Sequence, residues 1–208
     1  MATLEEKKAD WLHQHFQAIS RASNYYLYLL GTATVFSFVA FLSDHTSMKV
    51  PGLDMSIPRD LVLSASALIG SFLVVAFCGN YDKGEHTIQR LADTLGCEYE
   101  KLDFIDTHPN VFDFAKFASA SVVASRGYAA RLTVSLLYPL VLLIILGWFA
   151  YVVIYELFMY PVTGVPLAIY VAVVPVLFVA WRRAQRYVSR RWRTFLAIER
   201  AGGAGVSG

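Results

Sequence analysis

The sequence predicts an all-α integral membrane protein in which four transmembrane helices form two hairpins, with amphipathic cytoplasmic helices at the N- and C-termini. Four long stretches, residues 25–43, 61–81, 132–155 and 157–181, contain no Asp, Glu, Lys, Arg or His. A helix rises about 1.5 Å per residue and the hydrocarbon core of a bilayer is about 30 Å thick, so each stretch can cross it. A soluble bundle would need polar faces on these helices, which the four stretches lack.

Composition supports this fold class and limits the possible functions. Hydrophobic residues make up 56% of the 208 residues and charged residues 16%, whereas soluble domains average about 25% charged residues. The mean hydropathy is +0.48. Four spans of about 20 residues take up about 80 residues, which leaves little chain for a soluble catalytic domain. The net charge of +2 is too small to indicate nucleic-acid binding.

The apolar stretches divide the chain into five segments. We expect a cytoplasmic amphipathic helix in residues 1–24, a transmembrane hairpin in 25–81, a cytoplasmic helical loop in 82–130, a second hairpin in 131–181, and a basic cytoplasmic helix with a flexible tail in 182–208. The first helix is expected because apolar residues recur at roughly helical spacing, at Leu4, Trp11, Leu12, Phe16 and Ile19.

Glycine and proline indicate where further helices begin, bend and end. Within the loop, one helix is expected over residues 85–95, closed by Gly96, and another over 111–125, closed by Gly127. The last spanning helix is expected to begin near Pro166 and to bend at Pro175, and Pro139 is expected to bend the third span.

The distribution of basic residues predicts the orientation. Sixteen of the 18 lysines and arginines lie before the first span, between the second and third spans, or after the fourth, while only Lys49 and Arg59 lie in the first of the two other loops. Because basic residues concentrate on the cytoplasmic side, both termini are expected there. We expect no cleaved signal peptide, since the first apolar run is too long and lacks a cleavage site, and no segment removed before Met1. The Arg-, Ala- and Val-rich composition suggests a bacterial inner (plasma) membrane.

Two groups of residues are candidates for binding or assembly. Small residues in the second span have the spacing that lets helix backbones approach closely, although small polar residues of the first two spans could instead line a pore formed by several subunits. The basic aromatic stripe after the fourth span suits either the surface of an anionic leaflet or packing on neighbouring helices. The packing candidates are Ser66, Ala67, Gly70 and Ser71; the pore candidates are Thr32, Thr34, Ser37, Ser64 and Ser71; the membrane-surface or partner-contact candidates are Trp181, Arg182, Arg183, Arg186, Arg190, Arg191, Trp192 and Arg193.

Residues able to support catalysis or metal binding are sparse. His86, Cys97 and His108 do not match the spacing of a zinc site, so we expect no metal, cofactor or catalytic residue. Glu156, at the outer end of the third span, is the one charged residue between the last two spans, and we expect it to be a solvated loop glutamate. The acidic loop is expected to make a salt-linked contact with the basic C-terminal helix, either within a subunit or between subunits.

Together these features favour a non-enzymatic structural or accessory subunit of a membrane assembly, acting through helix packing and its cytoplasmic face. The alternative is an oligomeric ion channel or membrane-perturbing effector gated by the cytoplasmic loop, and a more distant one is an enzyme or transporter for a lipid-soluble substrate. The expected partners are the lipid bilayer, with anionic lipids at the cytoplasmic face, and further copies of the chain or other membrane subunits.

Overall fold

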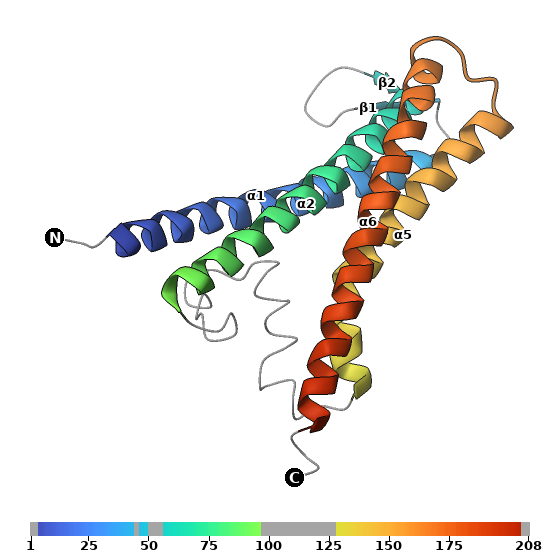
Figure 1. The fold of residues 1–208 in the computed structure, drawn as a ribbon. Coiled ribbons are helices and arrows are strands. Elements are labelled where there is room, and N and C mark those ends of the chain that lie inside the picture. Colours follow the sequence, from blue (N-terminus) through green and yellow to red (C-terminus); the bar gives the residue numbers. More distant parts are fainter. Residues whose placement is uncertain (1–3, 44–45, 50–55, 97–127, 205–208) are drawn as a thin grey trace. The chain divides into compact units, whose positions relative to one another are not determined.

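Four long helices dominate the computed structural model, which describes residues 4–43, 46–49, 56–96 and 128–204 (Figure 1). They are α1 (Leu4–Leu42), α2 (Arg59–Leu95), α5 (Tyr128–Met159) and α6 (Gly164–Ala204). Each contains a stretch that is long and apolar enough to cross a membrane. The prediction of four apolar helices that could span a bilayer is therefore confirmed.

A small β-ribbon joins α1 to α2. Strand β1 (Ser47–Lys49) pairs antiparallel with β2 (Ser56–Pro58), and Met48 lies opposite Ile57. The backbone N–H of Arg59 then donates to the carbonyl of Thr46, 3.0 Å away, so that α2 begins directly where the ribbon ends. This bond ties the first residue of α2 to the residue that precedes β1.

The helices are longer than the apolar stretches that predicted them. Helix α1 has 39 residues and α6 has 41, which correspond to about 58 and 61 Å of helix against a hydrocarbon core of about 30 Å. The expected N-terminal helix and first span form one uninterrupted helix, as do the second span and the helix expected over residues 85–95. Helix α2 ends at Leu95, and Gly96 follows with a φ of +61°, as its predicted role in closing the helix requires.

Proline and glycine set the turn between the last two helices. Helix α5 continues to Met159, so the first residues of the fourth apolar stretch belong to it, and α6 begins at Gly164, two residues before Pro166. Proline is tolerated in the first turn of a helix because its missing N–H would have no helical partner there. Pro139 and Pro175 lie inside α5 and α6, which continue through them. The helix expected over residues 111–125, with Gly127, lies outside the described residues.

The described residues form two compact units, and all four helices run through both. The span unit comprises Tyr26–Ala76 and Leu140–Arg186, and the extension unit comprises the described parts of Met1–Tyr25, Phe77–Pro139 and Tyr187–Gly208. In the span unit, the core includes Leu30, Leu63, Val74, Leu146, Phe149 and Tyr170. Many of its other apolar side chains are exposed, among them Phe72, Ile144, Val171 and Phe178, which is the surface that lipid or partner helices would cover.

In the extension unit, α1 buries one face of its expected amphipathic pattern. Leu12, Phe16 and Ile19 are buried, four and three residues apart, whereas Leu4 and Trp11 are exposed. The five apolar residues expected at helical spacing therefore lie on two different faces of α1, one buried and one exposed. The Trp11 ring stacks on His15 with centroids 5.2 Å apart.

Candidate functional site

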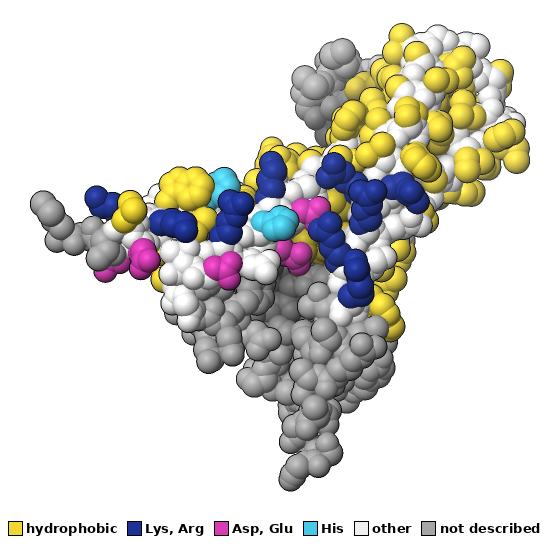
Figure 2. Space-filling view, in the orientation of Figure 1, with side chains coloured by type: hydrophobic (Ala, Val, Ile, Leu, Met, Phe, Trp, Pro, Cys, Tyr) yellow, Lys and Arg dark blue, Asp and Glu magenta, His cyan; other side chains and the backbone are white. Residues whose placement is uncertain are grey.

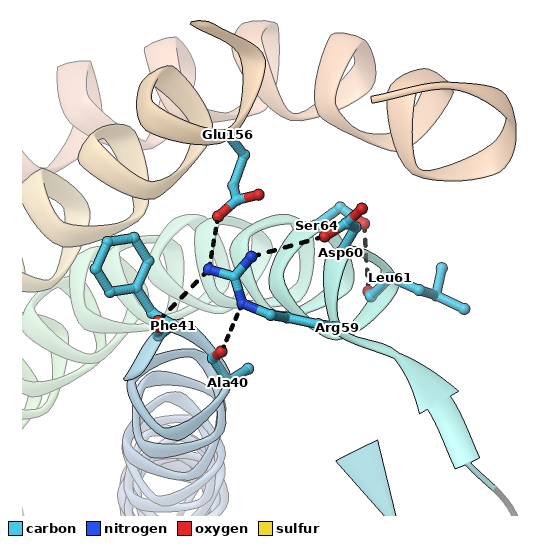
Figure 3. Close-up of polar contacts among 7 residues, drawn as sticks. All are labelled: Ala40, Phe41, Arg59, Asp60, Leu61, Ser64 and Glu156. Carbon is cyan, nitrogen blue, oxygen red and sulfur yellow. Dashed lines mark hydrogen bonds and ion pairs between the residues drawn. The ribbon is translucent and has the colours of Figure 1, made fainter. Parts of the chain in front are cut away.

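Arg59 closes the end of α1. The last four carbonyls of a helix lack intrahelical partners, and cationic donors are favoured there because that end of the helix dipole is negative. Arg59 Nε donates to the carbonyl of Ala40 at 2.9 Å, and Nη2 lies 3.4 Å from the carbonyl of Phe41 (Figure 3). The first side chain of α2 thus caps the last turn of α1.

The same guanidinium group pairs with a carboxylate from α5. Arg59 Nη2 lies 2.9 Å from Glu156 Oε1, and the side chains are 12% and 0% exposed, respectively (Figure 3). The expectation that Glu156 is a solvated loop glutamate is wrong, because α5 continues beyond it and packing encloses its side chain. Burying either charge alone is costly, so the pair is stable only with both partners present. The contact joins α1, α2 and α5.

Two polar atoms of the span unit are buried without a hydrogen-bond partner among the described residues. They are Glu156 Oε2 and the hydroxyl of Tyr170 on α6. An unmatched buried polar atom costs about 1–3 kcal/mol, so these atoms offer hydrogen-bonding capacity that the described chain does not use.

An aromatic cluster surrounds the ion pair. The Phe41 ring contacts Trp148, Tyr151 and Tyr155, with centroid distances of 5.2, 5.7 and 5.2 Å. Tyr160 extends the cluster from Tyr155 at 6.0 Å. Edge-to-face aromatic contacts of this kind add to the stability gained from burial.

A pocket of about 410 Å³ opens beside this cluster. The guanidinium carbon of Arg59 lies 6.0 Å from the Phe41 ring centroid and 5.6 Å from that of Tyr160, distances typical of cation–π contacts. Asp60, the second residue of α2, is 42% exposed, and its Oδ1 lies 3.9 Å from Arg59 Nη1. The pocket therefore combines aromatic rings with both signs of charge. Its lining residues are Phe41, Ser43, Thr46, Arg59, Asp60, Tyr155 and Tyr160.

The small residues expected to support helix packing lie on α2. Ala67 and Ser71 are fully buried and Ser66 is buried. Gly70 faces Phe149 of α5 so closely that a Cβ built on it would lie 2.2 Å from Phe149 Cε2. This close approach requires glycine at position 70.

The five small polar residues weighed as pore candidates all make hydrogen bonds within the chain. Thr32, Thr34, Ser64 and Ser71 donate to backbone carbonyls of their own helices. Ser37 accepts a hydrogen bond from Trp148 Nε1 at 3.1 Å. These hydroxyls thus have intrachain partners.

The basic aromatic candidates lie on α6, which reaches them from the last apolar stretch without a break. The side chains of Trp181, Arg182, Arg183, Arg186, Arg190, Trp192 and Arg193 are exposed, while that of Arg191 lies outside the described side chains. Figure 2 shows hydrophobic side chains over much of the surface at its upper right, and several Lys and Arg side chains are visible in the same view.

One contact predicted between the acidic loop segment and the basic helix is present. Arg190 Nη1 lies 2.6 Å from Asp82 Oδ1, within the extension unit. Beside this pair, Tyr187 of α6 packs edge-on against Tyr81 and Phe77 of α2. The prediction of a salt-linked contact is confirmed for this pair within one chain.

Of the three residues considered for metal binding, one lies within the described part of the chain. His86 is exposed on α2, and Cys97 and His108 lie outside the described residues. Within residues 4–43, 46–49, 56–96 and 128–204, no group of three or more His, Cys, Asp or Glu side chains could hold a metal ion.

Comparison with known proteins gives no assignment. No family model, curated protein or solved structure matches the chain.

Proposed function

We propose that this chain is a non-enzymatic, multi-pass membrane protein that serves as a structural or accessory subunit of a membrane assembly. The observation that carries the proposal is the engagement of the polar groups in the span unit. Arg59 of α2 bonds to two carbonyls of α1 and to Glu156 of α5, and Trp148 of α5 donates to Ser37 of α1, so these groups hold helices together. Transporters instead use intramembrane charges to bind or relay their cargo.

The exposed apolar side chains of the span unit support the second part of the proposal. Helices α1 and α6 bury only 17% of their most apolar segments within the chain. Lipid alone could cover this surface, but small residues and exposed aromatic rings also let further helices pack against it. We propose that a second copy of the chain or other membrane subunits cover part of it.

We further propose that the protein resides in a bacterial inner membrane, with both termini in the cytoplasm. The basic end of α6 then lies at the inner leaflet, where anionic lipid headgroups attract exposed arginines. The N-terminal part of α1 and the C-terminal part of α2 extend into the cytoplasm, because both helices are longer than a bilayer is thick.

Native mass spectrometry of the full chain, extracted from its membrane in a mild detergent, tests the proposal. Retention of a fixed set of other subunits, or a defined homo-oligomer without ion conductance after reconstitution, is the expected result. Ion conductance of the reconstituted pure chain would support the channel alternative and overturn the accessory role. A bound lipid-soluble substrate that the chain converts or transports would overturn it as well.

A further inference from the structure

The pocket beside the Arg59–Glu156 pair lies where the ends of three helices meet. Its walls come from the end of α1 at Phe41, the start of α2 at Arg59 and Asp60, and the end of α5 at Tyr155, with Tyr160 in the following turn. If the helices cross the bilayer as proposed, this end of the span unit lies in the headgroup layer of the leaflet opposite the termini.

Arg59 and Asp60 bring opposite charges to the pocket, and the buried Glu156 behind it adds a second carboxylate beside Arg59. Glu156 neutralises Arg59, so the three groups together carry one negative charge. Because Asp60 is 42% exposed and borders the pocket, this charge is available to a ligand. A cationic group in the pocket would restore neutrality.

Arg59 still has donors for an anionic oxygen. Its Nε and Nη2 are bound to Ala40, Phe41 and Glu156, whereas Nη1 makes no hydrogen bond among the described residues, because Asp60 Oδ1 at 3.9 Å is too far away. The pocket thus offers a hydrogen-bond donor beside a carboxylate and the aromatic rings of Tyr155 and Tyr160. A ligand that carries a phosphate next to an ammonium group matches this arrangement.

We propose that the pocket binds the zwitterionic headgroup of an amine-bearing phospholipid of the phosphatidylethanolamine type. The ammonium group lies between the Asp60 carboxylate and the faces of Tyr155 and Tyr160, which attract cations through their π-electrons. A phosphate oxygen accepts a hydrogen bond from Arg59 Nη1. The volume of about 410 Å³ falls within the range of pockets that hold small ligands. A headgroup that has a phosphate but no amine places a second negative charge beside Asp60 without a cation between them, and binds more weakly.

Native mass spectrometry from nanodiscs tests this site. The discs contain equal amounts of dioleoyl phosphatidylethanolamine and dioleoyl phosphatidylglycerol, which share acyl chains and phosphate but differ in the amine. We expect the full chain to retain the ethanolamine lipid at least about threefold more than the glycerol lipid. Asp60→Asn should bring the ratio close to one, whereas Asp93→Asn, an acid elsewhere on α2, should leave it unchanged.

A second pair of variants distinguishes a loss of headgroup binding from a loss of folding. Tyr155→Leu removes the ring and should reduce the preference, whereas Tyr155→Phe keeps the ring and should preserve it. Circular dichroism of each variant in the same nanodiscs checks that the helices remain intact. A wild-type ratio near one, or a ratio unaffected by Asp60→Asn, overturns the proposal.

A soluble ligand with the same chemistry is distinguished by a further measurement. Phosphoethanolamine is added to the chain in nanodiscs of the glycerol lipid alone. Binding that is lost in Asp60→Asn would support the same headgroup chemistry and identify a soluble source, whereas retention of the intact lipid alone would identify the bilayer as the source. Stable insertion into the nanodiscs without a headgroup preference would overturn this site and leave the accessory role standing.

Discussion

The ring of Phe149 fills the space that any side chain at position 70 would need. A Cβ on Gly70 would lie 2.2 Å from Cε2 and 2.3 Å from Cζ of this ring. Phe149 is itself fully buried, so its ring cannot swing aside without disturbing its neighbours. The glycine therefore determines how closely α2 and α5 approach.

Gly70→Ala should destabilise the protein by about 1–3 kcal/mol, the usual cost of overpacking a close-packed core. Gly147→Ala is the matched control, because a Cβ at Gly147 meets no atom within 4 Å and alanine favours a helix by about 0.5–1 kcal/mol. Thermal unfolding in detergent, followed by circular dichroism, compares the two variants. Equal stability would contradict the close contact.

Removing the Glu156 carboxylate should lower the stability of the protein more than Gly70→Ala does. Glu156→Ala leaves Arg59 buried without its partner and should cost about 3–5 kcal/mol of unfolding free energy. Arg59→Lys keeps the charge but loses the planar fork that reaches Ala40, Phe41 and Glu156 together, so a smaller loss is expected. The same unfolding assay measures both losses.

A double-mutant cycle isolates the coupling between the two residues. In the Arg59→Gln/Glu156→Gln variant neither charge remains. Its loss of unfolding free energy should therefore be smaller than the sum of the losses in Arg59→Gln and Glu156→Gln measured separately. Strict additivity would mean that the two side chains do not interact in the folded protein.

The proposed orientation can be tested by cysteine labelling. In a chain carrying Cys78→Ala and Cys97→Ser, Ser47→Cys on β1 should react with a membrane-impermeant maleimide in intact cells or spheroplasts. Ser189→Cys on α6 should react only after permeabilisation. Both positions are exposed, so reactivity reports the side of the membrane. The reverse pattern would place both termini outside.

The arginines that follow the last apolar stretch should control binding to anionic lipid. Replacing Arg182, Arg183 and Arg186 with glutamine should weaken retention of phosphatidylglycerol by about 3 kcal/mol, at about 1 kcal/mol for each base. Replacing the same three with lysine keeps the charge and should retain most of the binding. Lipid retention in native mass spectra, recorded at two salt concentrations, provides the measurement, and no difference between the two triple variants would argue against the electrostatic role.

The sequence was a good guide to the four spans and to some of the helix ends, but not to the length of every helix. Uncharged stretches predicted four spans, and Gly96 was correctly expected to close a helix because only glycine adopts positive φ without strain. The change along α1 from an amphipathic to an apolar sequence was interpreted as a boundary between two helices. It marks only a change in what the side chains contact, because backbone hydrogen bonds continue along a helix whatever its side chains contact.

The ion pair was missed because it depends on how the two hairpins pack. Arg59 and Glu156 are 97 residues apart, and no local pattern relates them. A weaker signal was present: Arg59 adjoins an apolar stretch, and Glu156 is the only charged residue between the last two stretches. Opposite charges beside spans on the same side of a membrane are candidates for pairing. The pocket was not predicted at all, since its walls come from three separate segments.

The position of the Arg59–Glu156 pair also constrains the order in which the chain can fold during its synthesis. Arg59 belongs to the first hairpin and Glu156 to the second, so a ribosome must synthesise α5 before the arginine can meet its carboxylate. Until then the guanidinium group has only the carbonyls at the end of α1 as acceptors from the contacts described above. Once the second hairpin has inserted, Glu156 can pair with Arg59. Insertion of the second hairpin is therefore the step that stabilises the packing of the first.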